Sequence, residues 1–352
     1  MSFACPPVGF AKASVPVTFG AIRWDAWYGT NANIADQTAA TLSWTSPIDY
    51  SARSPAHANQ STNPQTWGDN QTTFDAEITA AVTGGLDYFI FTTGTANNFG
   101  AALAYYMASS KKNQIKFCSM ASSNNMGSTG NFTTQINAIV TTMGDTQYMK
   151  VNGRPLLFIY MSTTDIANFW GGSNSNFVTM ITALRAAAIT ASLLSPYIVT
   201  MGGGGDDHTS TATFSVDAVT NYAVAIPTGV GAPFATLAAG AESYWTTVLT
   251  ASAIVPICMS GWDPSPRNQH PESFASYEGA NWFIAPQISD LAVHLTAARR
   301  YIQNNRARCP ANTAIVYAWN EYDEGHSVIS PTVAEPTGSV ARAFNVAKVN
   351  MW

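Results

Sequence analysis

Three acidic residues, Glu321, Asp323 and Glu324, have the types and the spacing that acid–base chemistry needs. They directly follow 313–319 (TAIVYAW), an apolar segment with the pattern of a buried strand. Like charges this close repel one another, and burial raises the pKa of at least one carboxyl group. Glu321 and Glu324, three positions apart over a turn, can face one cavity as an acid and a base. The competing interpretation is a solvated acidic loop or a helix N-terminus.

Two other segments, 24–29 (WDAWYG) and 261–267 (GWDPSPR), also follow apolar runs and combine aromatic with charged residues. The simpler interpretation of the second is a proline-stiffened turn with an Asp263–Arg267 ion pair. For the first, it is that Trp24 and Trp27 only close the end of the core.

Aromatic rings can stack on the C–H faces of sugars, and carboxylate and guanidinium groups bind hydroxyls in fixed geometry. Two carboxyl groups are also the usual machinery for cleaving a glycosidic bond. The sequence therefore indicates a poly- or oligosaccharide ligand. The expected substrate-contacting residues are Trp24, Asp25, Trp27, Tyr28, Trp262, Asp263, Arg267, Trp319, Asn320, Tyr322, Asp323 and His326.

Other chemistries have weaker support in the sequence. It contains no G-x-S-x-G nucleophile motif. Asp206, Asp207 and His208 could bind a metal, but two adjacent acids and one histidine are a weak signal. The glycine run 202–205 lacks the GK[ST] that follows in a phosphate-binding loop. We therefore expect neither a metal nor a cofactor.

Short apolar runs alternate with helical periodicity along most of the chain, which predicts a single α/β (β/α)8 TIM barrel with long βα loops. A doubly wound open sheet is the structural alternative. Only the stretch between the fifth and sixth strands lacks a long helix. The expected strands are 17–24, 86–92, 115–121, 156–161, 197–201, 222–226, 254–260 and 313–319, and the expected helices are 73–84, 99–110, 132–144, 175–190, 236–251 and 287–306.

The segments that follow the strands carry the polar and aromatic residues, as expected for βα loops at the catalytic face of a barrel. The longest of them, 29–72, is too short and too poor in apolar periodicity to hold its own core. We therefore expect it to be a rim or lid on one catalytic domain that spans 1–352.

The charge balance bears on partners and location. Sixteen basic against 21 acidic residues give a net charge of −5, which argues against nucleic acid and anionic membranes. No run of about 18 apolar residues predicts a membrane span. Only 11% of residues are charged, and Thr, Ser and Asn are abundant, so we expect a secreted or cell-surface protein, although the first residues do not resemble a signal peptide. A Cys5–Cys309 disulfide and the oligomeric state are left open.

The segment 318–326 (AWNEYDEGH) resembles the NEW-x-EG signature of glycoside hydrolase family 99 and the WbsX-like group. Segments 23–29 (RWDAWYG), 75–91, 148–160 and 261–267 are also similar, and the resemblance spans about 17–348. It implies a (β/α)8 barrel that acts on polysaccharides. It also implies that Glu321 is the base that assists the substrate 2-hydroxyl, giving a 1,2-anhydro sugar and net retention, with Glu324 as the acid/base.

Three alternatives to this function are open. One is a two-carboxylate hydrolase that pairs Glu324 with Asp25 or Asp263. Another is a non-catalytic carbohydrate-binding or phage/cell-surface protein that keeps the barrel. A glycosyltransferase is the third, although the sequence has neither a DxD motif nor a phosphate-binding loop.

Overall fold

The computed structural model describes most of the chain. The described residues are 16–29, 34–43, 48–62, 65–93, 100–162, 164–203, 211–224, 226, 229–249, 251, 253–271, 279, 281–328 and 343–349, with the backbone alone at 34–38, 67, 326, 327 and 349.

Eight parallel strands form the central sheet, which confirms the predicted TIM barrel. The sheet order is β11-β13-β1-β4-β5-β7-β8-β9. Its two ends meet where Val219 of β9 pairs in parallel with Ile254, just before β11. The strands are β1 Thr18–Arg23, β4 Tyr88–Thr93, β5 Lys116–Ser122, β7 Arg154–Met161, β8 Tyr197–Gly202, β9 Ala218–Asn221, β11 Ile257–Met259 and β13 Thr313–Tyr317.

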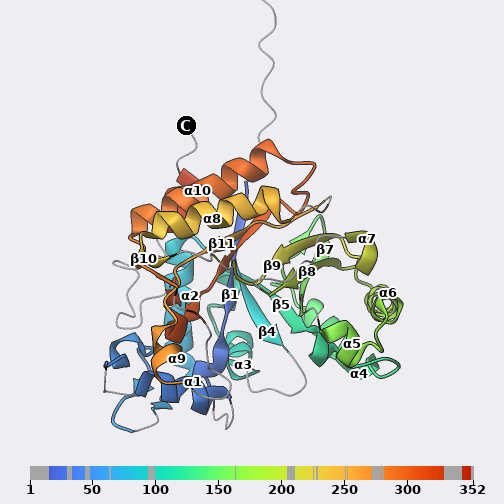
Figure 1. Ribbon diagram of the computed structural model, residues 1–352. Coiled ribbons are helices and arrows are strands. Elements are labelled where there is room, and N and C mark those ends of the chain that lie inside the picture. The colour runs from blue at the N-terminus through green and yellow to red at the C-terminus, as the bar shows by residue number, and fades with distance from the viewer. Residues whose placement is uncertain are drawn as a thin grey trace, which may run out of the picture.

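Helices surround these strands (Figure 1). In Figure 1, α8 and α10 lie side by side over β11, with which both are in contact. The longer helices are α2 Gln71–Gly84, α3 Gly100–Ala108, α4 Thr133–Met143, α6 Asn174–Thr190, α8 Phe234–Thr247 and α10 Ile288–Asn304. The shorter ones are α5 Asp165–Phe169, α7 Thr211–Phe214, α9 Ser265–Gln269 and α11 Ala343–Val349.

The local sequence explains where these helices lie. In α10, the side chains Leu291, Leu295, Ala298 and Ile302 recur on one face and are buried. In α2, the Asn70 side chain accepts a hydrogen bond from Thr73 N at 3.0 Å and so caps the first turn. Helix periodicity and capping residues therefore place the helical layer against the barrel.

The sixth strand differs from the sequence prediction. We expected 222–226 (YAVAI), but the strand is β9, Ala218–Asn221. Its polar side chains have buried partners, since Thr220 donates to Val255 O at 2.7 Å and Asn221 Nδ2 to the Tyr244 hydroxyl at 2.6 Å. The hydrophobic run 222–226 was thus a misleading signal, because two of the four strand residues are polar and are buried with hydrogen-bond partners.

The 29–72 segment contains a helix that its sequence does not predict, α1 Ile34–Ser43. A 3-10 helix, η2 Ser51–Arg53, and a hairpin of β2 Ala58–Asn59 and β3 Thr66–Trp67 follow it. Leu42 is buried, and Ser43 Oγ accepts from Gln65 N at 2.8 Å. Tertiary contacts therefore support a helix whose own periodicity is weak.

Helix α1 lies beside α9 at the carboxyl end of β1 (Figure 1). The rim segment thus reaches the end of the barrel that carries the predicted functional residues. Across the described residues, no helix combines the length and the apolar character that crossing a bilayer requires.

Candidate active site

The predicted acidic residues lie at the carboxyl end of β13. Asn320 and Glu321 form β14, and η5, Tyr322–Glu324, is a single 3-10 turn that follows it. Gly325 ends this turn with a φ of 67°, a conformation that favours glycine. There Asp263 N donates to Glu324 O at 2.7 Å, so the loop after β11 packs directly on the acidic turn.

One guanidinium group, that of Arg267 on α9, joins the three acids. Its Nε donates to Asp323 Oδ2 at 2.7 Å and its Nη1 to Glu324 Oε1. Its Nη2 lies 3.7 Å from Glu321 Oε1, which is an ion-pair distance but not a hydrogen bond. Glu321 and Glu324 therefore lie at the two terminal nitrogens of one guanidinium group, which makes the two carboxyls close neighbours.

Two tyrosines complete this cluster. The Tyr317 hydroxyl donates to Glu324 Oε2 at 2.7 Å. The Tyr222 ring packs against the Tyr317 ring at 4.5 Å between centroids. Both carboxyl groups raise the pKa of Tyr222, after burial itself, which is the largest cause. Two aromatic side chains therefore lie beside the buried acids.

Burial perturbs both glutamates strongly. Glu321 is 2% and Glu324 5% exposed. Desolvation, then the nearby Glu324, raise the pKa of Glu321 well above its ordinary value, against the opposing effect of Arg267. Desolvation also raises the pKa of Glu324, although Arg267 opposes it more strongly than any other group. Two neighbouring carboxyls with separated proton affinities are the arrangement that acid–base catalysis uses.

Some buried polar atoms of the cluster lack hydrogen-bond partners within the described part of the chain. They are Glu321 Oε2, Asp323 Oδ1 and Arg267 Nη2. An unpaired buried polar atom costs about 1–3 kcal/mol. Such costs are typical of functional sites, where a ligand can supply the missing partner.

A second buried ionic cluster lies between β1 and α2, centred on Arg23. Its Nε donates to Asp25 Oδ1 at 3.0 Å and its Nη1 to Glu77 Oε2 at 2.7 Å. Asn320 connects the two clusters, because its Nδ2 donates to Asp25 Oδ1 at 3.3 Å and its Oδ1 accepts from Trp24 N at 2.8 Å. Asp25 and Asn320 therefore hold the acidic turn on the barrel.

Three of the predicted sugar-stacking rings have no exposed face. Trp27, Tyr28 and Trp319 are fully buried. Trp27 Nε1 donates to Asn320 O at 2.7 Å, while Trp319 Nε1 and the Tyr28 hydroxyl both donate to Glu77. Their burial supports a structural role rather than stacking on a ligand. For Trp27 this agrees with the simpler interpretation, in which the ring closes the end of the core.

The ion pair considered for Asp263 and Arg267 does not form. Asp263 instead accepts from Arg53 of the rim segment, while Arg267 turns toward the acidic turn. Asp263 Oδ1 also accepts from Ser265 N at 3.1 Å, which holds the carboxyl at its own loop. The two residues were paired because they are close in sequence, but each finds a partner from a distant segment.

The other predicted site residues are placed as follows. Trp24 and Trp262 are partly buried, and Tyr322 is buried with its ring edge-on to Trp27 at 5.3 Å. The side chain of His326 lies outside the described residues, as do Asp206, Asp207 and His208. Among described residues, no group of three or more His, Cys, Asp and Glu side chains is arranged to hold a metal ion.

Sequence reasoning missed several residues around the acids, namely Arg53, Glu77, Tyr222 and Tyr317. Glu77 carried a usable signal, because it is a carboxylate on the buried face of a predicted helix. His294 is buried away from the acids, where its ring stacks on Trp245 at 5.8 Å between centroids and its Nδ1 lies 2.8 Å from Glu242 Oε1. Cys118, Cys258 and Cys309 are buried free thiols, and Cys5 lies outside the described residues.

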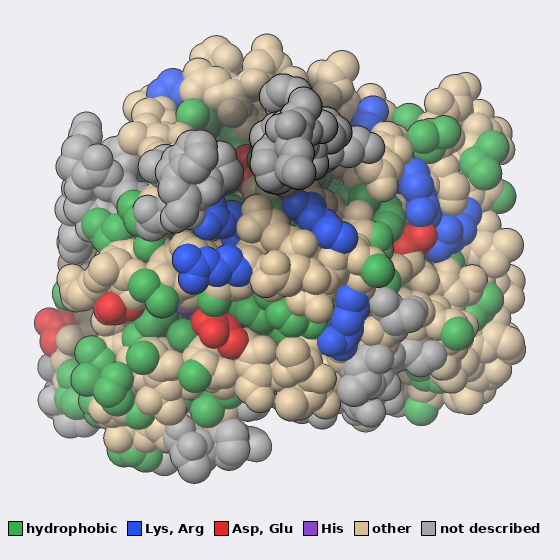
Figure 2. All heavy atoms as spheres, turned by 90° about the horizontal axis from the view of Figure 1, so that it is seen from above, with side chains coloured by type: hydrophobic (Ala, Val, Ile, Leu, Met, Phe, Trp, Pro, Cys, Tyr) green, Lys and Arg blue, Asp and Glu red, His purple; other side chains and the backbone are tan. Residues whose placement is uncertain are grey.

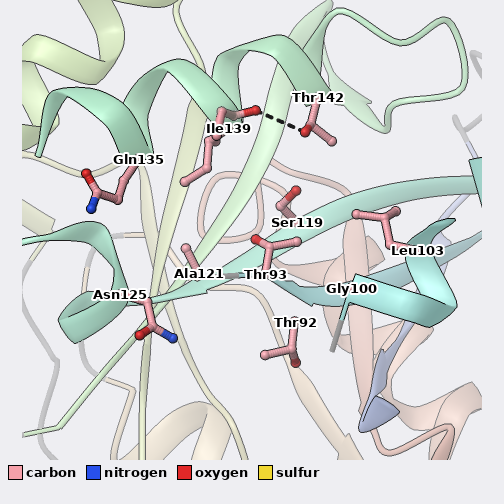
Figure 3. Close-up of a pocket in the computed structure, with 11 residues that line it drawn as sticks. Thr92, Thr93, Gly100, Leu103, Ser119, Ala121, Asn125, Gln135, Ile139 and Thr142 are labelled. Carbon is pink, nitrogen blue, oxygen red and sulfur yellow. Dashed lines mark hydrogen bonds between the residues drawn. The ribbon is translucent and has the colours of Figure 1, made fainter. Parts of the chain in front are cut away.

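A separate cavity of about 210 Å³ lies between the sheet and helices α3 and α4 (Figure 3). Gln135, Ile139 and Thr142 of α4 face Thr93 and Ser119 across it. The lining residues have no titratable side chain. The cavity therefore offers no acid or base, and the acidic turn is the better candidate for chemistry.

Comparison with known proteins supports the fold. A structure described as a glycoside hydrolase-like protein is 13% identical, with a TM-score of 0.56, and 98% of this chain and 96% of that chain are covered. The GH99 endo-α-mannosidase from Bacteroides thetaiotaomicron with bis-tris-propane is 14% identical, with a TM-score of 0.59 and 94% of each chain covered. A second structure of a GH99 endo-α-mannosidase from that organism is 12% identical, with a TM-score of 0.54, and covers 93% of this chain and 96% of its own.

At these identities the likeness is one of fold. The chain therefore has the barrel that the family 99 resemblance implies, over almost its whole length. No protein-family model and no curated protein sequence matches the chain.

Proposed function

We propose that this protein is a glycoside hydrolase in which Glu321 and Glu324 are the two catalytic carboxyl groups. The observation that carries this proposal is their joint burial against Arg267 at the carboxyl end of the barrel. Loops at that end hold the active sites of TIM-barrel enzymes. Cleavage of a glycosidic bond needs one group to protonate the leaving oxygen and another to activate the attacking oxygen.

The fold likeness suggests which substrates to try first. The solved neighbours include GH99 endo-α-mannosidases, so α-linked mannans are the first polysaccharides to test. Net retention, through attack by the sugar's own 2-hydroxyl, is the stereochemistry that the family resemblance implies. Trp24 and Trp262, which are only partly buried, are the aromatic residues we propose for sugar contact.

Product release from a panel of α- and β-linked polysaccharides tests the proposal. With a cleaved substrate in hand, Glu321→Gln and Glu324→Gln should each lower kcat by about 10²- to 10⁴-fold. The matched control is Glu242→Gln on α8, where the carboxyl contacts His294 on the outside of the barrel. It should leave turnover unchanged. Near wild-type activity of either site variant would refute the assignment.

The same panel separates the rival functions. Binding of a polysaccharide without product release would favour a non-catalytic carbohydrate-binding protein. Loss of activity in Asp263→Asn comparable to that in Glu324→Gln would favour a pair of Glu324 and Asp263. Asp25 is a weaker partner for Glu324, because it is fully buried and bonded to Arg23 and Asn320. Proton NMR of the first product formed would report the anomeric configuration.

A secreted or cell-surface location follows as a proposal from the substrate class and from the low charge content of 11%. Fractionation of the producing cells, with detection of the full-length chain, would test it. Recovery of the chain from the cytosol alone would contradict it.

A further inference from the structure

Trp282 differs from the other tryptophans because its side chain reaches the surface. It is 38% exposed, more than any other tryptophan among the described side chains. It begins β12, Trp282–Phe283, which pairs in parallel with β10, Val230–Ala232. Successive side chains of a strand point to opposite faces. Phe283 is accordingly buried, whereas Trp282 and Ile284, on the other face, are exposed to solvent.

Two glycines of the neighbouring segment let the rings of β12 pack closely on the backbone. Gly231 has a φ of 67°, which favours glycine, and a Cβ there would lie only 3.0 Å from the Trp282 ring. A Cβ at Gly229 would lie 2.2 Å from the Phe283 ring. The Trp282 ring is therefore held against β10 on one side. A ring that is already held in place loses little conformational freedom when a ligand binds, which favours affinity.

Backbone hydrogen bonds connect this pair of strands to the acidic turn. Strands β10 and β12 belong to the connections that lead from β9 to α8 and from β11 to α10, which lie at the carboxyl end of the barrel. Phe283 N donates to Trp262 O at 2.7 Å. The next residue, Asp263, donates from its N to Glu324 O at 2.7 Å. Segments bonded in this way lie about 4.8 Å apart, so β12 is roughly two such spacings, about 10 Å, from the acidic turn. Trp282 therefore lies beside the candidate active site but not in it.

The size and chemistry of this surface indicate what covers it. It consists of three uncharged side chains, Val230 at 70%, Ile284 at 54% and Trp282 at 38% exposure. A stable protein–protein interface buries about 800 Å² on each partner, from roughly 20–30 residues, which three side chains cannot supply. One indole ring between two aliphatic side chains instead matches the C–H face of a single sugar ring.

We propose that Trp282, flanked by Val230 and Ile284, is a sugar-binding subsite that holds the polysaccharide chain beyond the unit that is cleaved. The proposal rests on the proposed glycoside hydrolase function, because the same chain must also reach Glu321 and Glu324. Trp282 takes no part in the chemistry. It increases the affinity for long chains, whereas an oligosaccharide that occupies only the acidic turn does not reach it.

Kinetics of the full-length chain on long and short substrates test the subsite. On the polysaccharide that the enzyme cleaves, we expect Trp282→Ala to raise KM about tenfold and to leave kcat unchanged, because binding of the chain is weakened equally in the ground and transition states. On the shortest oligosaccharide that is cleaved, we expect no change in KM. Trp282→Tyr, which keeps an aromatic ring, should retain most of the affinity. An equal rise of KM on both substrates, or no rise on the polysaccharide, would overturn the proposal.

Leu194→Ala is the matched control. Leu194 is also an exposed apolar residue, but it lies between α6 and β8, at the amino-terminal end of the barrel. We expect it to leave both KM values unchanged. Circular dichroism checks that each variant is folded, which we expect because Trp282 and Leu194 are at the surface.

Binding without catalysis separates this proposal from the hydrolase function. Affinity electrophoresis through gels that contain the polysaccharide measures binding, and in a Glu324→Gln background we expect Trp282→Ala to weaken it about tenfold. If binding depends on Trp282 but the wild type releases no product, the subsite is supported and the hydrolase function fails. If the wild type releases product but Trp282→Ala binds as tightly as its parent, only the subsite fails. If sedimentation showed a wild-type dimer that Trp282→Ala dissociates, a second copy of the chain would cover the ring, and the proposal would be overturned.

Discussion

Acidic residues at the two ends of the barrel differ in how completely they are paired with cations and hydrogen-bond donors. At the amino-terminal end, Asp217 accepts from Ile198 N at 2.9 Å and pairs with both Arg154 and Arg185. Asp87 likewise accepts from Phe19 N at 2.7 Å and from Lys348 at 2.8 Å. Figure 2 shows this face, where Lys and Arg side chains gather with acidic side chains among them. Each of these two carboxylates therefore has at least one cationic partner in addition to a backbone donor.

At the carboxyl end, by contrast, three buried acids share Arg267. One oxygen of each of two acids, Glu321 Oε2 and Asp323 Oδ1, has no hydrogen-bond partner in the described part of the chain. The acids at the amino-terminal end tie strands to neighbouring helices and favour folding. Those at the other end keep an electrostatic cost that folding alone does not remove. Such a cost is expected where a site is organised for a ligand rather than for stability.

The buried cluster around Arg23 shows what a satisfied interior charge is worth. Glu77→Leu would leave Arg23, the Tyr28 hydroxyl and Trp319 Nε1 without their common acceptor. We expect the free energy of unfolding to fall by about 3–5 kcal/mol, the cost of removing one partner of a buried ion pair. Urea denaturation followed by tryptophan fluorescence measures it. Glu242→Leu, at a partly exposed site, is the control and should cost less than about 1 kcal/mol.

Asp217→Ala tests the amino-terminal end. It removes two partly exposed ion pairs and leaves the buried Ile198 N without its side-chain acceptor. We expect a loss of about 2 kcal/mol in the free energy of unfolding and no change in kcat. A fall in kcat with unchanged stability would contradict the proposal that acids at the amino-terminal end stabilise the fold and those at the carboxyl end act in catalysis.

Glu321→Gln tests the carboxyl end through the pH dependence of stability. Burial raises the pKa of Glu321 in the folded state. The contribution of this carboxyl to wild-type stability is therefore fully present below the ordinary pKa of 4.5 and is lost as the pH rises through the folded-state pKa. Glutamine does not ionise, so the variant should avoid this loss. At pH 7 we therefore expect the variant to be more stable than the wild type, and at pH 4 we expect this difference to be smaller.

Thermal unfolding between pH 4 and pH 8 measures this difference, and Glu77→Gln provides the opposite case. Burial alone would raise the pKa of Glu77, but Arg23 and Tyr28 outweigh it and lower the pKa. Glu77 therefore contributes stability above pH 4.5 that is lost as the pH falls through its folded-state pKa. If the two variants showed the same pH dependence, the electrostatic contrast proposed here would be wrong.

The sequence by itself determined most of the barrel. Strands such as β4 and β7 are apolar runs of the right length, and the helix α10 has a buried face with the period of a helix. The position of Glu321 and Glu324 at the end of the last strand also followed from the sequence, because a buried strand running into acidic residues is a local pattern. The position of strand β9 was not predicted, because Thr220 and Asn221 are polar residues whose hydrogen-bond partners are distant in sequence.

Only the tertiary structure decided the partners of the acids. Arg267 is 56 residues from Asp323 and bonds to it, although Asp263 is only four positions away. Tryptophan is a residue type expected in a sugar-binding site, yet the fold buries Trp27 and Trp319. Their indole N–H groups donate to Asn320 O and to Glu77. The physical reason is that hydrophobic periodicity is a local property of the chain. Burial and charge pairing instead depend on which distant segments the closed barrel brings into contact.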